Sequence, residues 1–92
     1  MLDANTGWTV GSGGTIRKTT DGGSNWTSQT SGTSNTLSSI HMLDANTGWT
    51  VGQDGKILKT TDGGSNWSSQ SSGTSATLFS IHMLDANTGW IV

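Results

Sequence analysis

The chain has 92 residues, no cysteine and a formal net charge of −2, with only four basic residues. So few positive charges exclude a basic surface for nucleic acid or for an anionic membrane, and the lack of cysteine excludes a disulfide framework. Apolar runs of at most three residues predict no transmembrane segment and no signal peptide. Five tryptophans and regularly spaced β-branched residues favour strands over disorder, although the composition is polar.

The sequence repeats after 41 residues. Residues 1–41 and 42–82 are identical at 33 of 41 positions, and residues 83–92 begin a third copy. A period near 40–45 residues with several short strands is typical of a propeller blade, whereas no apolar pattern follows the helical period. We therefore predict a first blade repeat with an incomplete inner strand, a second blade repeat, and the start of a third repeat that overlaps the first or is swapped between chains.

Each unit predicts four short strands joined by turns. In the second copy they cover residues 37–44, 49–52, 56–61 and 66–71. Asp54-Gly55, between the second and third strands, favours a type I′ turn. Ile57 and Leu58 are neighbours on the third strand and point to opposite faces, so both faces are apolar, as a blade between two other blades requires. We predict an all-β protein of β-propeller blades, each a four-stranded antiparallel sheet.

A motif that occurs twice lies between the third and fourth strands. It reads Thr-Thr-Asp-Gly-Gly-Ser-Asn-Trp at residues 19–26 and again at residues 60–67. The two glycines predict a sharp turn with positive φ, closed by the aspartate carboxylate, and the tryptophan is predicted to pin the turn to a core. The motif resembles the Asp-box, a folding motif of propeller blades. The resemblance implies structural roles for Thr19, Asp21, Gly23, Asn25, Trp26, Thr60, Asp62, Gly64, Asn66 and Trp67.

The whole unit resembles one family, the photosystem II stability and assembly factor-like propellers. The resemblance is carried by Leu-Asp-Ala-Asn-Thr-Gly-Trp-x-Val-Gly and Gly-x-Ile-Leu-Lys-Thr-Thr-Asp-Gly-Gly-Ser-Asn-Trp, and it covers the entire chain. It implies a propeller of about seven blades, of which two and a quarter are present, and in plants and cyanobacteria an assembly chaperone that binds a photosystem subunit. The four basic residues do not form the basic surface associated with those members. Near-identical copies indicate recent duplication, or a designed or cut-down chain.

Two blades leave two apolar faces without a neighbour, so we predict that identical chains close into a ring. With two repeats per chain, a trimer would have six blades and a tetramer eight. Residues 83–92 nearly repeat residues 1–10, and residues 78–82 supply what the first copy lacks before Met1. An arbitrary choice of boundaries is the alternative interpretation. The predicted partner is the chain itself, and a glycan or a protein ligand is the alternative.

Two of the eight differences between the copies are predicted to meet across neighbouring blades. Arg17 and Ser38 in the first copy become Leu58 and Phe79 in the second. We predict that Leu58 and Phe79 form the apolar contact that holds chains together. Arg17 and Ser38 would then serve the junction within one chain.

His41 and His82 occupy equivalent places on the predicted innermost strand. A ring would therefore place imidazoles around its axis, where they could bind a metal or an anion. Hydrogen-bonded packing residues are the alternative interpretation. Trp8, Trp49 and Trp90 are predicted to face inward, with an exposed row for glycan stacking as the alternative.

No set of residues predicts catalysis. A sialidase-like reaction needs a tyrosine, a glutamate and an arginine cluster, but the chain has no tyrosine, no glutamate and one arginine. A glycosidase needs two carboxyl groups across a cleft, yet every aspartate except Asp54 belongs to a repeated turn or strand end. We predict no enzyme and no cofactor. The first hypothesis is a self-assembling scaffold, and the second is a glycan- or protein-binding propeller module.

Overall fold

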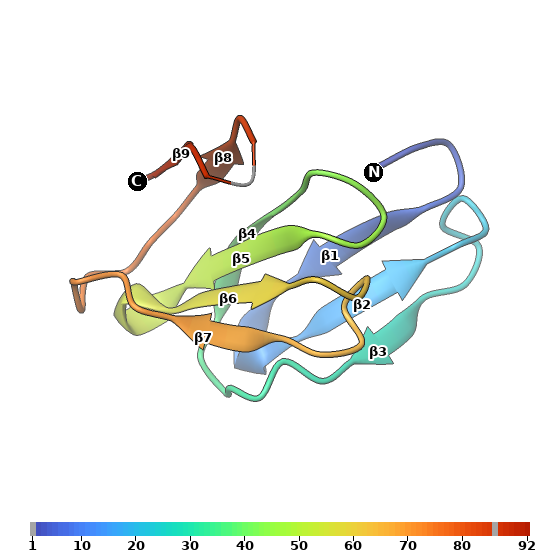
Figure 1. Ribbon diagram of the computed structural model, residues 1–92. Coiled ribbons are helices and arrows are strands. Elements are labelled where there is room, and N and C mark those ends of the chain that lie inside the picture. The colour runs from blue at the N-terminus through green and yellow to red at the C-terminus, as the bar shows by residue number, and fades with distance from the viewer. Residues whose placement is uncertain (1, 86) are drawn as a thin grey trace.

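The computed structural model describes residues 2–85 and 87–92, which form three antiparallel sheets (Figure 1). The first sheet contains β1 (Gly7–Val10), β2 (Ile16–Thr19) and β3 (Thr27–Gln29) in that order. The second contains β4 (Leu37–Met42), β5 (Gly48–Gly52), β6 (Ile57–Thr60) and β7 (Ser68–Gln70). The third contains β8 (Ile81–Met83) and β9 (Gly89–Ile91). The predicted all-β fold is confirmed, and no helix among the described residues could cross a membrane.

Some strands are shorter than predicted because side chains capture the backbone at their ends. β4 ends at Met42 rather than at residue 44, since the Asp44 carboxylate accepts the N–H groups of Asn46 and Thr47, both at 2.8 Å. β7 begins at Ser68 rather than at residue 66. The Asn66 N–H donates to the Asp62 carboxylate at 2.9 Å and so belongs to the preceding turn.

The turn between β5 and β6 has the predicted type I′ geometry. Asp54 and Gly55 both have positive φ, 59° and 67°, and the Lys56 N–H donates to the Gln53 carbonyl at 3.2 Å. A Cβ at Gly55 would also collide with the carbonyl of Thr74, in the segment that crosses to the third sheet. Glycine is therefore required here both for its backbone conformation and for the close approach of another chain segment.

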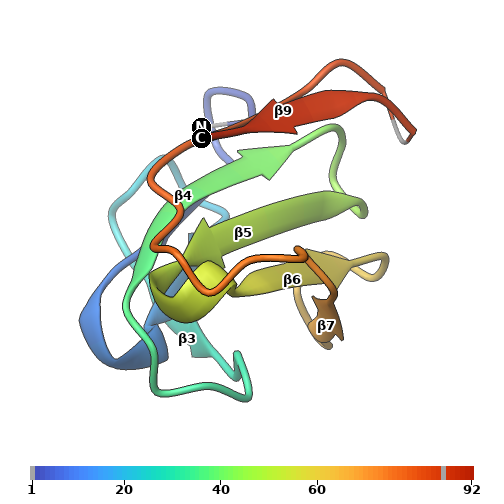
Figure 2. The ribbon, with the colours of Figure 1, turned by 90° about the vertical axis from the view of Figure 1, so that its left-hand side faces the viewer.

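The hydrophobic core is divided into two parts, one at each junction between sheets. The first junction core, between the first and second sheets, has the buried members Trp8, Ile16, Leu37 and Leu58. The second junction core, between the second and third sheets, has the buried members Trp49, Val51, Ile57, Leu78 and Ile81. Figure 2 shows β9 and its sheet lying beside β4. Ile57 and Leu58 lie in different cores, which confirms that the second sheet is apolar on both faces.

The predicted contact between Leu58 and Phe79 is wrong. Leu58 is 1% exposed and lies in the first junction core. Phe79 follows Leu78 of the second junction core in the sequence, but its own side chain is 70% exposed. The alternation of β6 turns Ile57 toward the third sheet and Leu58 toward the first. Arg17 has the place of Leu58 in the first sheet, so it lies exposed on the face turned away from the second sheet. Leu58 thus serves the junction within the chain, the reverse of the predicted assignment.

The burial of each tryptophan also depends on whether a neighbouring sheet covers it. Trp8 and Trp49 are buried as predicted, and Trp67 packs against the first junction core. Trp26 and Trp90 were expected to face inward but are 37% and 61% exposed. Among the described residues no sheet precedes the first or follows the third, so neither side chain has a neighbouring sheet to cover it. Because Trp8 and Trp49 are buried, the alternative of an exposed row for glycan stacking is not supported.

Candidate functional site

The inner edge of the first sheet differs from that of the second. In the second sheet β4 pairs with β5, and Ile40, His41 and Met42 face Thr50, Trp49 and Gly48. Within the described part of the chain, β1 pairs with β2 alone. Its other side therefore presents backbone N–H and C=O groups without a strand partner. Such an edge is a template for an added extended segment.

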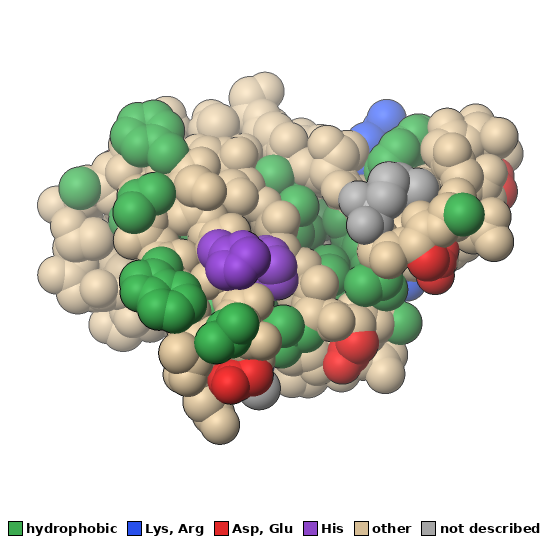
Figure 3. Space-filling view, turned by 90° about the horizontal axis from the view of Figure 1, so that it is seen from above, with side chains coloured by type: hydrophobic (Ala, Val, Ile, Leu, Met, Phe, Trp, Pro, Cys, Tyr) green, Lys and Arg blue, Asp and Glu red, His purple; other side chains and the backbone are tan. Residues whose placement is uncertain are grey.

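A hollow of about 300 Å³ lies beside this edge. It is lined by Leu2 and Trp8 from the first repeat and by Ile40, His41 and Met42 from β4. In the space-filling view, hydrophobic side chains gather on both sides of the two histidines (Figure 3). The hollow thus lies between β1 and β4, where an inner strand of the first sheet would run, and it is lined by four apolar residues and one histidine, although more of its surface is polar than apolar.

The structure brings His41 and His82, the two residues of the predicted axial site, together. They lie on β4 and β8, the inner strands of neighbouring sheets, with ring centroids 5.2 Å apart and ring planes at 68°. His41 is half-buried and His82 is exposed. Burial lowers the pKa of His41, and the nearby charge of His82 lowers it further. His41 is therefore a neutral imidazole at neutral pH, which leaves a nitrogen lone pair available.

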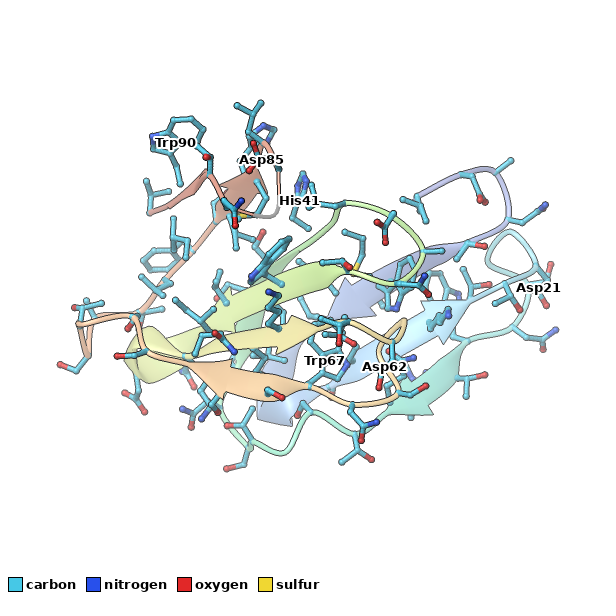
Figure 4. The ribbon with its side chains drawn as sticks, in the orientation of Figure 1. Asp21, His41, Asp62, Trp67, Asp85 and Trp90 are labelled. Carbon is cyan, nitrogen blue, oxygen red and sulfur yellow. The ribbon has the colours of Figure 1, made fainter. Side chains whose placement is uncertain are left out.

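The two aspartate turns share one hydrogen-bond network. In the first turn the Asp21 carboxylate accepts the Asn25 backbone N–H at 2.9 Å and its side-chain N–H at 2.8 Å. The Thr19 hydroxyl donates to the same carboxylate at 2.8 Å. These bonds, the Asn25 backbone N–H first, lower the pKa of Asp21 to about 2. The carboxylate is thus occupied in closing the turn, and both aspartates lie away from His41 in Figure 4.

The second turn repeats these contacts around Asp62. Its carboxylate accepts the Asn66 side-chain N–H at 2.8 Å and backbone N–H at 2.9 Å, in that order of effect on its lowered pKa. The resemblance implied a structural role for the threonine but did not specify its hydrogen bonds. The Thr60 hydroxyl is almost fully buried and accepts the Gly64 N–H at 2.8 Å, as Thr19 accepts the Gly23 N–H at 2.9 Å. The signal was present, because serine or threonine two residues before an aspartate commonly binds local backbone.

The second turn also joins the two sheets. The Gly63 carbonyl accepts hydrogen bonds from Gln29 at 3.2 Å and from the Lys18 ammonium group at 3.4 Å. Lys18 lies over the Trp8 ring at 5.0 Å, and Lys59 lies over Trp49 at 5.5 Å. Each lysine–tryptophan pair lies within one sheet, on directly paired residues of neighbouring strands. The contacts of Gly63 were not predicted, because they depend on how one sheet is placed against the next. They make the turn part of the first junction.

Three further carboxylates are also held in turns by backbone N–H groups. Asp3 and Asp44 each accept two backbone N–H groups, and these bonds lower the pKa of both side chains. Asp85 accepts the N–H groups of Asn87 and Thr88 in the same way. Among the described residues no group of three or more His, Cys, Asp or Glu side chains could hold a metal ion. The functional features of the described surface are therefore the edge of β1, its hollow and the histidine pair.

Comparison with known proteins agrees with the fold. A family model described as photosynthesis system II assembly factor YCF48 matches residues 1–77. A solved structure described as YCF48 bound to D1 peptide is similar over 100% of this chain, with a TM-score of 0.82 and 29% sequence identity. The chain spans 31% of the length of that structure. No curated protein matches the chain. The propeller-blade fold and the resemblance inferred from the repeat are both confirmed.

Proposed function

Because the chain belongs to the family of the photosynthesis system II assembly factor YCF48, we propose that it is a non-enzymatic propeller module that binds extended protein segments. The binding surface is the edge of β1 with its adjoining hollow. In a solution of the 92-residue chain, the segment bound there is the inner strand of another copy, so the chains assemble into a ring. The relative described as bound to a D1 peptide is about three times as long as this chain, so this proposal concerns only the blades present here.

One observation carries the proposal: the chain contains a second copy of the strand that the first sheet lacks. Residues 78–83 repeat residues 37–42, the β4 strand, with Phe79 in place of Ser38 as the one difference. Shifting the β4–β5 register by one repeat gives the expected pairing on β1. The expected pairs are Leu78 with Gly11, Ser80 with Val10, Ile81 with Thr9, His82 with Trp8, and Met83 with Gly7.

β9 and the β1 strand of another copy compete for the same edge of β8. Both hold the same position in the repeat, and in each chain β8 already pairs with β9. A two-stranded sheet is only marginally stable, whereas β1 is followed by β2 and β3. Exchange of β9 for β1 therefore completes a four-stranded sheet and covers the second junction core. Such an exchange of identical elements is an accessible route to oligomers.

Light scattering with size-exclusion chromatography tests the self-assembly directly. The expected mass is that of a trimer or a tetramer, and a folded monomer at micromolar concentration would refute assembly. The register is tested by cysteine pairs, since the chain has no cysteine of its own. Val10→Cys with Ser80→Cys should give disulfide-linked oligomers. The matched pair Thr27→Cys with Ser80→Cys places one thiol on the far strand β3 and should not.

A partner other than the chain itself is the second candidate. It is favoured by the similar structure described as bound to a D1 peptide. A synthetic peptide of residues 78–83 distinguishes the two: if the chain is a monomer that binds this peptide, the edge of β1 serves another protein. If the chain is a monomer and the peptide does not bind, the proposed surface is wrong.

A further inference from the structure

The two imidazoles at the inner edge lie close together, although His41 also lines the hollow beside β1 and His82 lies on the segment proposed to bind there. His41 comes from the second sheet and His82 from the third, and their ring centroids are 5.2 Å apart. One ring is half-buried and the other is exposed, so solvent ions reach the pair. Figure 3 shows the two side chains touching on the surface. Both residues belong to the same chain, so the pair exists whether or not copies assemble.

The alternative role of hydrogen-bonded packing residues lacks support. Burial and the neighbouring imidazole are what alter the pKa of His41, and no hydrogen bond contributes to that shift. The imidazole of His82 is the titratable group that contributes to this shift, and it lies beside His41. Both side chains are imidazoles, and each has two ring nitrogens. In their neutral form each has a nitrogen lone pair for a ligand.

We propose that His41 and His82 together bind one divalent transition-metal ion, with solvent filling its other positions. A metal–nitrogen bond is about 2.0–2.1 Å long, so two imidazoles on one tetrahedral ion have ring centroids roughly 5 Å apart. The observed separation of the ring centroids, 5.2 Å, matches that value. Imidazole suits zinc, copper and nickel, whereas magnesium and calcium prefer oxygen ligands. Because the described residues include no third protein ligand, the ion is exchangeable.

Metal binding should hold the third sheet against the second. His41 is on β4 and His82 is on β8, so an ion bound to both links the two inner strands. An ion that binds only the folded arrangement stabilises it by mass action. Metal should therefore raise the melting temperature and protect the amide groups of β8 from hydrogen exchange.

Calorimetric titration with Zn²⁺ and electron paramagnetic resonance with Cu²⁺ test the site. We expect one ion per chain, a copper spectrum with two nitrogen ligands, and no binding of Mg²⁺. Affinity should fall as the pH is lowered, because protons compete for the imidazoles. His41→Asn and His82→Asn should each weaken zinc binding at least tenfold, whereas Asp54→Asn, on an exposed turn, should not.

Circular dichroism of each variant separates loss of binding from loss of folding. His82 is exposed, so His82→Asn should keep the wild-type spectrum while losing the metal. Unchanged zinc affinity in both histidine variants would overturn the site. One ion per two chains would also overturn it, because it would place the ion between copies. Neither outcome bears on strand exchange, which is measured by mass without metal.

Discussion

The first and second sheets have nearly the same sequence but different surroundings. Trp67 packs against the first junction core, whereas its equivalent Trp26 is 37% exposed. Gly64 is buried so closely against Gln29 that a Cβ would collide with it, whereas Gly23 is only half-buried. The hydrogen bonds within the two aspartate turns are nonetheless alike to about 0.1 Å. Local structure thus follows the repeat, and burial follows the neighbouring sheet.

One sequence difference between the copies falls at a position that is buried in one copy and exposed in the other. Position 58 is a buried leucine between two sheets, and the equivalent position 17 is an arginine on an outer face. The Arg17 Nε–H donates to the Ser28 hydroxyl at 3.4 Å, within its own sheet. The substitution is therefore explained by the side of the sheet on which it lies.

Placing each of these two residues at the other's position, in separate variants, should produce the largest difference in stability between the sheets. Leu58→Arg places an unpaired charge in the first junction core, so we expect a loss greater than the about 2–5 kcal/mol of a buried Leu→Ala change. Arg17→Leu is a surface change, for which we expect about 0.5 kcal/mol or less. Urea unfolding of both variants measures the difference. Equal losses in the free energy of unfolding would contradict the assignment of position 58 to a buried face and position 17 to an exposed face.

The buried threonine of the second turn should matter more than its counterpart. Thr60→Val keeps the shape but leaves the buried Gly64 N–H without its acceptor. We expect a loss of about 1–3 kcal/mol in the free energy of unfolding. Thr19→Val should cost less, since Gly23 is only half-buried and can bind water. The comparison by chemical denaturation would contradict this account if Thr19→Val were the more destabilising.

Acid should destabilise both sheets through their turn carboxylates. The folded chain lowers the pKa of Asp21 from 3.8 to about 2 and also lowers that of Asp62. Below pH 3.8 the unfolded chain therefore binds protons that the folded chain does not, and stability falls as the pH drops from about 4 toward 2. Thermal melts between pH 5 and 2 should show this decline. A double variant, Asp21→Asn with Asp62→Asn, should be less stable at pH 5 and should depend less on pH.

Phe79→Ser should have the smallest effect. It converts residues 78–83 into a perfect copy of residues 37–42 and removes a side chain that is 70% exposed. We expect the free energy of unfolding to change by about 0.5 kcal/mol or less and the oligomer mass to stay the same. A shift of the mass toward smaller species would instead support the predicted contact between chains through Phe79.

Much of this fold was determined by the sequence alone, because the interactions concerned are local. The strands, the type I′ turn at Asp54-Gly55 and the aspartate turns each depend on residues within a few positions of one another. The alternation along β6 also predicted that Ile57 and Leu58 face opposite sides. These features need no knowledge of where the next sheet lies.

Only the tertiary structure decided which of the repeated side chains have neighbours. Near-identical copies carry no information about their order around an axis, so Trp26 and Trp90 were expected inside and lie outside. The Leu58–Phe79 contact failed for the same reason, because equal spacing along the chain does not say which face meets which sheet. The distance between His41 and His82 likewise depends on how β4 and β8 are placed. A side chain is buried only where two sheets meet, whereas each repeat encodes the residues of a single sheet.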